Sequence, residues 1–134
     1  MHRRAVAVAA VAIALPVSYA GIAAAQTGNA AQTVRMKEFS FTMRNNLKAG
    51  KTPFTFRNGG QFPHNFTVVA TLGGGKAFKT ATIQPGKQLQ KSVSLKPGVY
   101  VAVCTVFNGG HLAQGMEKTF TVGTFDQQKG TWGP

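Results

Sequence analysis

Four side chains with metal-binding potential stand out in this sequence. Cys104, His111 and Met116 lie close together near the C-terminus, and His64 lies 40 residues before the cysteine. A thiolate, two imidazoles and a thioether are the ligands of a trigonal His2Cys copper site with a weak axial methionine. The residue types therefore predict a site for one copper ion per chain.

Each of these residues has an ordinary explanation when it is taken alone. A free cysteine is often a buried small hydrophobe, and a methionine often fills a gap in a core. A single histidine commonly lies at the surface or at a cap. However, Cys104 is the only cysteine of the chain, and His64 and His111 are the only histidines after His2. Their combination with Met116 favours the metal site over four unrelated structural roles.

The first 25 residues are expected to be a cleaved secretory signal peptide. The basic pair Arg3-Arg4 precedes an almost wholly apolar run over residues 5–25, which ends in small residues. Cleavage after Ala25 would leave a domain at 26–123 and a polar tail at 124–134. An uncleaved membrane anchor is the alternative, because the run is just long enough to span a bilayer. With cleavage we expect no stable membrane insertion, and a location in the periplasm or on the extracellular side of the cell.

The exported domain would be strongly basic. Without Arg3 and Arg4 the chain keeps 13 Lys and Arg against three acidic residues, a formal charge of +10. Such a field attracts an anionic partner and speeds its association without specifying the partner. The basic residues are scattered and are not interleaved with aromatic platforms, so nucleic acid is not an expected partner.

The sequence after residue 26 reads as short strands separated by turns. Apolar positions alternate in several runs, and pairs such as Pro85-Gly86 and Pro97-Gly98 mark turns between them. A change of parity at Lys37-Glu38 predicts a bulge or bend within the first strand region, and residues 77–83 are a further strand candidate. No segment has a convincing helical period. Seven to eight strands at regular spacing predict an all-β sandwich or barrel.

Two segments carry a resemblance to a known family. They are residues 59–65, GGQFPHN, and residues 98–106, GVYVAVCTV, the second continuing through Gly110-His111 to Gly115-Met116. Over residues 33–122 the chain resembles a small bacterial cupredoxin of the plastocyanin and azurin type. The resemblance implies a Greek-key β-sandwich that holds a type 1 (blue) copper ion. It also implies that His64, Cys104 and His111 are the equatorial ligands and Met116 the axial one.

The resemblance assigns roles to residues beside the ligands as well. Asn65 matches the family residue that joins the two ligand loops by hydrogen bonds, and Thr105 matches the hydroxyl residue that supports this bracing. An apolar docking patch is expected around the histidines, formed by Phe62, Pro63, Leu112 and Ala113.

The chain departs from the family in the arm between the cysteine and the second histidine. Family members often have the form Cys-Thr-Val-Pro-Gly-His, whereas here Phe107-Asn108-Gly109 stands in place of the single proline and adds two residues.

One-electron transfer between redox partners is the leading functional hypothesis. We expect a monomer whose redox partner presents an acidic surface. A periplasmic copper carrier or chaperone and a non-redox binding module of the same fold are the alternatives. Copper nitrite reductases and multicopper oxidases share the fold but need further histidines for a catalytic copper. The sequence after residue 26 has no histidine beyond His64 and His111, so we do not expect an enzyme.

Overall fold

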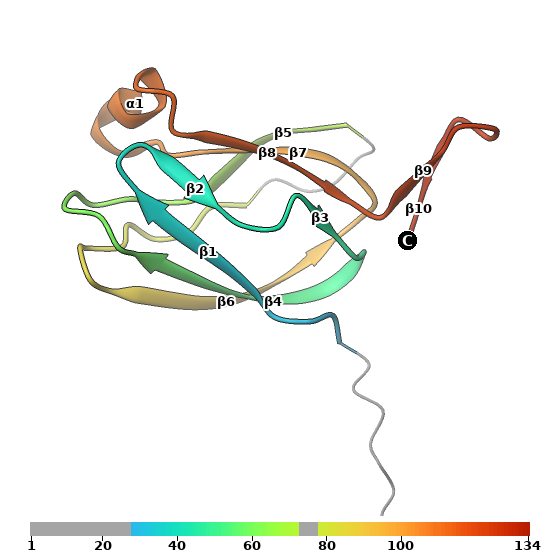
Figure 1. Cartoon of the computed structure of the whole chain (residues 1–134), viewed down its shortest axis with the longest axis horizontal. Helices are drawn as coiled ribbons and strands as arrows, with labels where there is room; N and C mark the ends of the chain where they lie inside the picture. The colour runs from blue at the N-terminus through green and yellow to red at the C-terminus, as the bar shows by residue number, and fades with distance from the viewer. Residues whose placement is uncertain (1–27, 73–77) are drawn as a thin grey trace, which may run out of the picture.

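Two four-stranded sheets pack face to face in the computed structural model, which describes residues 28–72 and 78–134 (Figure 1). The predicted signal peptide and the glycine run at 73–75 lie outside the described residues. The first sheet has the order β2-β1-β4-β6, and the second has the order β3-β8-β7-β5. Their strands are β1 (Gln32–Lys37), β2 (Ser40–Thr42), β3 (Asn46–Leu47), β4 (Gly50–Asn58), β5 (Thr67–Leu72), β6 (Gln88–Leu95), β7 (Gly98–Val103) and β8 (Glu117–Val122).

The predicted all-β sandwich is confirmed. The two sheets together hold eight strands, within the predicted seven to eight, and the β9–β10 hairpin adds two more among the described residues. The very short strand β3 was not recognised from the sequence. A two-residue strand cannot show the alternation of apolar and polar positions on which a sequence-based assignment depends. The pairs β1–β4 and β3–β8 are parallel, and the other pairs within the two sheets are antiparallel.

Alternating burial shows why these segments form the two layers. In β1, Val34 and Met36 are buried while their neighbours are exposed, and in β4, Phe54 and Phe56 occupy the same position facing the core. The second sheet contributes Tyr100 and other side chains to the same apolar cluster. Burying each large apolar side chain contributes about 1.5–3 kcal/mol relative to leaving it exposed. The sandwich therefore provides a rigid support for the loops at its ends.

The first strand region contains a tight reversal of the chain. β1 ends at Lys37 and β2 begins at Ser40, and the antiparallel register places Met36 opposite Phe41. The irregularity predicted at Lys37-Glu38 is therefore a turn between two strands, and not a bulge or bend within the first strand region. The alternation of apolar positions changes here because the chain passes from one strand to the next. A bulge within a single strand would give the same change in the sequence. The reversal places Glu38 at the tip of the β1–β2 turn.

The strand expected at 77–83 is also wrong for the residues that the structure describes. Residues 78–83 make only two isolated bridges, which pair Lys79 with Thr67 and Ile83 with His64. The His64 N–H donates to the Ile83 carbonyl at 3.1 Å, and the Ile83 N–H donates to the His64 carbonyl at 2.8 Å. This pairing fixes the backbone of His64 without a continuous strand.

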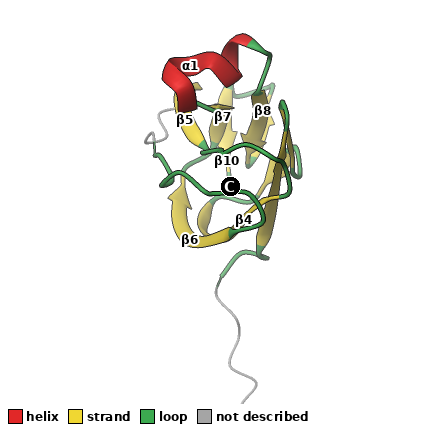
Figure 2. Ribbon diagram, turned by 90° about the vertical axis from the view of Figure 1, so that its left-hand side faces the viewer, coloured by secondary structure: helices red, strands yellow, loops and turns green. Residues whose placement is uncertain are grey.

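A short helix, α1 (Val106–Ala113), was not predicted from the sequence. The helix contains a kink, at which Phe107 and Asn108 have φ values of 52° and 53° and Gly109 has a φ of 84°. A kinked segment of this kind has no regular 3.6-residue repeat of apolar positions, which explains why its pattern was not recognised. Figure 2 shows α1 at the end of the molecule, above β5, β7 and β8.

The expected tail contains regular structure. β9 (Thr124–Asp126) and β10 (Thr131–Gly133) form an antiparallel hairpin, in which the rings of Phe125 and Trp132 lie 5.4 Å apart between centroids. This hairpin and α1 lie at opposite ends of the molecule (Figure 1). Within the described part of the chain, no helix is long and apolar enough to cross a membrane.

Candidate metal centre

His64, Cys104 and His111, the last of which belongs to α1, form one buried cluster. The exposed fractions of their side chains are 0%, 0% and 5%, respectively. The His64 Nδ1 lies 3.0 Å from the His111 Nδ1, and the Cys104 Sγ lies 3.8 Å and 3.5 Å from these two nitrogens. The two imidazoles and the thiol therefore point at one another from segments that are 40 residues apart in the sequence.

The spacing of these three atoms suits a single metal ion. Bonds of about 2.1 Å to nitrogen and about 2.3 Å to sulfur, spread evenly in a plane, would separate the ligand atoms by about 3.6–3.8 Å. The two sulfur–nitrogen distances, 3.5 Å and 3.8 Å, lie close to this range. The nitrogen–nitrogen distance of 3.0 Å is shorter, which corresponds to a narrower angle between the imidazoles. A set of one thiolate and two imidazoles suits copper.

Met116 is connected to both of its neighbours in the cluster. Its side chain is fully buried. The Met116 N–H donates to the His111 carbonyl at 3.0 Å, and the Met116 carbonyl accepts from the Cys104 N–H at 3.1 Å. These backbone hydrogen bonds close the loop from Cys104 to Met116 into a compact unit that presents one cysteine, one histidine and one methionine.

Asn65 joins the segment of His64 to the segment of Cys104. Its side-chain Oδ1 accepts from the Thr105 N–H at 2.8 Å, and its Nδ2 donates to the Thr105 Oγ1 at 3.0 Å. The Asn65 backbone N–H also points at the Cys104 Sγ, at 3.5 Å. The paired amide contacts hold the two loops in one register.

Glu38, which the sequence analysis did not identify, lies on the outer side of His64. The His64 Nε2 is 3.1 Å from the Glu38 Oε1. The same oxygen accepts from the backbone N–H groups of Gln61 and Phe62, at 2.7 Å and 2.8 Å. No sequence motif marks this contact, because it depends on the β1–β2 turn meeting a loop more than 20 residues away.

The pKa values of two groups at the centre are displaced. The hydrogen bond from the Phe62 N–H is the largest cause that lowers the pKa of Glu38, from 4.5 to about 2, and partial burial opposes it. Burial lowers the pKa of His111, and the nearby His64 acts in the same direction while Glu38 opposes it. The carboxylate is therefore charged and His111 is favoured in its neutral form, which is the form that binds a metal.

Aromatic rings surround His111. The ring centroids of Phe39 and Phe107 each lie 5.1 Å from that of His111, and Phe62 lies at 6.2 Å, all with edge-on geometry. Phe107 belongs to the lengthened arm and is 61% exposed. Sequence reasoning noted that arm but did not assign this contact to Phe107.

Of the expected docking patch, Phe62 and Pro63 lie in the loop before His64, and Leu112 and Ala113 are the last residues of α1. Phe62 and Leu112 are 50% and 38% exposed, respectively. Ala113 is exposed and Pro63 is half-buried. Among the exposed apolar side chains, those of Phe62 and Phe107 lie against the His111 ring.

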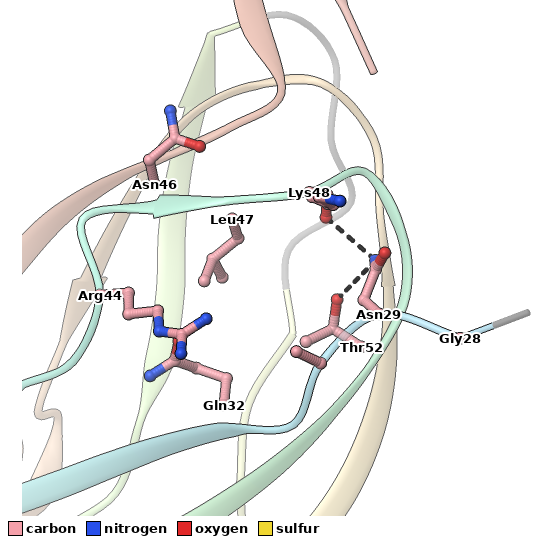
Figure 3. Close-up of a pocket in the computed structure, with 9 residues that line it drawn as sticks. Gly28, Asn29, Gln32, Arg44, Asn46, Leu47, Lys48 and Thr52 are labelled. Atoms are coloured by element: carbon pink, nitrogen blue, oxygen red, sulfur yellow. Dashed lines mark hydrogen bonds between the residues drawn. The ribbon is translucent and has the colours of Figure 1, made fainter. Parts of the chain in front are cut away.

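A cavity of about 330 Å³ lies away from these residues (Figure 3). It is lined by Asn29, Gln32, Arg44, Lys48 and other residues near the start of β1. The Asn29 side chain donates to the Lys48 carbonyl and to the Thr52 hydroxyl, both at 3.1 Å. Its lining contains no cysteine, histidine or carboxylate, so this cavity is not the predicted metal site.

Comparison with known proteins gives structural matches only. No protein-family model matches the sequence, and no curated protein matches it. Auracyanin from the photosynthetic bacterium Roseiflexus castenholzii matches with a TM-score of 0.56 and 20% identity, over 70% of this chain and 97% of its own. The azurin Az-iso2 from Methylomonas sp. strain J matches with a TM-score of 0.55 and 15% identity, over 70% and 98%.

A third match is to a larger protein. The Cu-containing nitrite reductase from Thermus scotoductus SA-01 has a TM-score of 0.50 and 25% identity, over 89% of this chain and 25% of the reductase. The chain thus spans about a quarter of that protein. At these identities the matches establish the fold and not the activity. The expected resemblance is confirmed at that level: this chain has the cupredoxin fold, with His64, Cys104 and His111 gathered at one end of the sandwich.

Proposed function

We propose that this chain is an exported type 1 copper protein that carries one electron at a time between redox partners. The observation that carries the proposal is the buried cluster of His64, Cys104 and His111, whose three ligand atoms lie within 4.8 Å of one another. Met116, whose backbone is bonded to those of Cys104 and His111, would supply a thioether as the fourth ligand. Bound copper would supply the one-electron change between Cu(I) and Cu(II).

The role of the protein is to hold its ligands in one arrangement. The bridge to Ile83 fixes the backbone of His64, and the Asn65–Thr105 hydrogen bonds fix the distance between the loops. Because the ligands are positioned by the fold and not by the metal, little has to move when the charge at the site changes. Burial keeps water away, which hinders reactions other than electron transfer.

The spectrum of the copper-loaded protein tests this proposal. With Cu(II), the wild type should show an intense thiolate-to-copper band in the visible range, and Cys104→Ser should abolish it. Thr105→Ser, which keeps a hydroxyl next to the cysteine, is the matched control and should keep the colour. A colourless Cu(II) protein would reject the type 1 assignment, and a protein that holds only Cu(I) would favour a copper carrier.

The proposal excludes catalysis by the single chain. Among the described residues, His64 and His111 are the only histidines, and both belong to the cluster. A second copper bound by imidazoles, as a catalytic site of this fold requires, therefore finds no further histidine in the described part of the chain. Nitrite reduction by the copper-loaded protein would contradict this part of the proposal.

We further propose that the partner presents an acidic surface around its redox centre. The charge of +10 that remains without Arg3 and Arg4 would steer the encounter, and the apolar surface around His111 would make the final contact. Exposed charges are screened beyond about 10 Å at 0.1 M salt. Electron transfer with an acidic partner should therefore slow about ten-fold or more between low and high salt, within the range of electrostatic steering. A rate of electron transfer that does not depend on ionic strength would mean that docking rests on apolar contact alone.

A further inference from the structure

We propose that Glu38 is a positioning residue for His64. Its carboxylate fixes the tautomer of the imidazole and makes the site hold Cu(II) more tightly relative to Cu(I). The part that concerns copper rests on the proposed function, and the part that concerns the tautomer does not.

The geometry determines the proton position on His64. A carboxylate is acceptor-only, and the Glu38 Oε1 already accepts from the backbone N–H groups of Gln61 and Phe62. The contact of 3.1 Å to the His64 Nε2 therefore requires the proton to be on that nitrogen. In the neutral imidazole the Nδ1 then carries the lone pair, and this is the atom that faces Cys104 and His111.

A second observation indicates that the site accommodates the carboxylate. A Cβ added at Gly60 would collide with both carboxylate oxygens of Glu38. A side chain at residue 60 would therefore displace the carboxylate from its present position beside the His64 ring. Its N–H donates to the side chain of Asn58 at 2.9 Å, which holds the loop in place beside the acid.

The other two acidic residues of the chain have no such position. Glu117 is exposed, and Asp126 belongs to the β9–β10 hairpin at the far end of the molecule (Figure 1). Glu38 thus provides the negative charge that contacts the cluster in a domain that is otherwise strongly basic.

The expected consequence follows from the hydrogen bond. A carboxylate that accepts the outer N–H of a ligating histidine raises the basicity of the ring, and removing such a partner typically costs 10–100-fold in metal affinity. A more basic ligand and a nearby negative charge both favour Cu(II) over Cu(I). Removing the charge should therefore weaken Cu(II) binding more than Cu(I) binding.

The test compares Glu38→Gln with Asp126→Asn. Both substitutions remove one negative charge and keep the size of the side chain, but only the first acts beside His64. Nitrogen-15 NMR of the metal-free proteins reports which nitrogen of His64 is protonated. Titration with Cu(II) and Cu(I), together with voltammetry, reports the two affinities and the reduction potential.

We expect the wild type to carry its proton on the His64 Nε2, and Glu38→Gln, whose amide oxygen can still accept from this N–H without a charge, to hold the same tautomer less firmly. We also expect Glu38→Gln to lose at least ten-fold in Cu(II) affinity relative to Cu(I), which for one electron equals a rise in potential of about 59 mV. Asp126→Asn should change neither quantity to this extent. If Glu38→Gln does not fold, Glu38→Asp keeps the charge but withdraws it from the ring, and should show a smaller change of the same sign.

Two results separate the possible failures. If the metal-free wild type carries the proton on the His64 Nδ1, or if both charge-removing variants shift the potential equally, the assignment of Glu38 is overturned. If the wild type shows the expected tautomer but no coloured copper site, the positioning role stands and the proposed electron-transfer function falls.

Discussion

The two histidines of the cluster are held in different ways. His64 is fully buried, its backbone is paired with Ile83, and its outer nitrogen contacts the Glu38 carboxylate. His111 lies on the kinked helix α1, and aromatic rings surround its imidazole. Hydrogen bonds and a charge therefore hold His64, whereas packing holds His111.

This difference separates two functions of the centre. Directional hydrogen bonds fix the tautomer and the angle of a ring, while packing excludes water and leaves an apolar surface outside. The His64 side can therefore set the electronic properties of a bound metal. The His111 side faces the exposed rings of Phe62 and Phe107, where a partner could approach.

The largest effect is expected at the connection between the two sides. Asn65→Ala removes both side-chain hydrogen bonds to Thr105 and leaves the Thr105 N–H without its acceptor. The free energy of unfolding should fall by about 2–3 kcal/mol, as measured by urea denaturation of the metal-free protein. Asn45→Ala, at an exposed position, is the control and should cost less than about 0.5 kcal/mol. Equal losses in the two variants would show that the loops are not joined through Asn65.

A smaller effect concerns the acid stability of the His64 side. The pKa of Glu38 is about 2 in the folded protein, below its ordinary value of 4.5. A lowered folded-state pKa contributes stability above the unfolded-state pKa, and this contribution is lost as the pH falls through the folded-state value. The unfolding free energy of the metal-free wild type should therefore fall more between pH 4.5 and pH 2 than that of Glu38→Gln. If the unfolding free energies of the two proteins depend on pH in the same way, the pKa of Glu38 does not differ between the folded and unfolded states.

The His111 side is tested by Phe107→Asn. Phenylalanine in the left-handed region costs about 1–2 kcal/mol, and asparagine tolerates that region better. This relief and the lost contact with the His111 ring, about 0.5–1.5 kcal/mol, should nearly cancel. The unfolding free energy should then change by less than about 1 kcal/mol, while added imidazole or azide should perturb the copper spectrum of the variant more than that of the wild type.

The control for that variant is Phe125→Asn, which changes an exposed phenylalanine in the β9–β10 hairpin. It should leave the response to imidazole and azide unchanged. If Phe107→Asn shows the same response as the wild type, Phe107 does not shield His111.

The two sides also differ in how far the sequence could predict them. Residue types identified His64, Cys104, His111 and Met116, because few side chains in the chain can bind a soft metal. Alternation of apolar residues likewise predicted the sandwich, since long strands such as β4 show it clearly.

The contacts that distinguish the two histidines could not be read from the sequence. Glu38 meets His64 only because the β1–β2 turn folds onto residues 60–62, and an acid in a turn is ordinarily solvated. Phe107 covers His111 because of a left-handed backbone that no repeat of apolar residues encodes. Both depend on chain reversals whose direction is set by tertiary packing.

The smallest effect is expected for Met116, whose backbone is bonded to both Cys104 and His111. Because these hydrogen bonds do not involve its side chain, Met116→Leu should preserve the loop, and a swap of similar volume usually costs less than about 1.5 kcal/mol. A long axial thioether tunes the potential of such a copper site more than it holds the metal. The variant should therefore keep its copper and its colour, with less than about ten-fold loss of Cu(II) affinity. Its reduction potential should rise, because Cu(II) loses more electron donation than Cu(I) does.

The control is Met36→Leu, at a buried methionine of β1, which should leave the reduction potential unchanged in the same voltammetric measurement. Complete loss of copper from a folded Met116→Leu protein would show that the thioether is needed to hold the metal. It would also show that His64, Cys104 and His111 do not bind copper without a fourth ligand, however firmly the fold supports the two histidines.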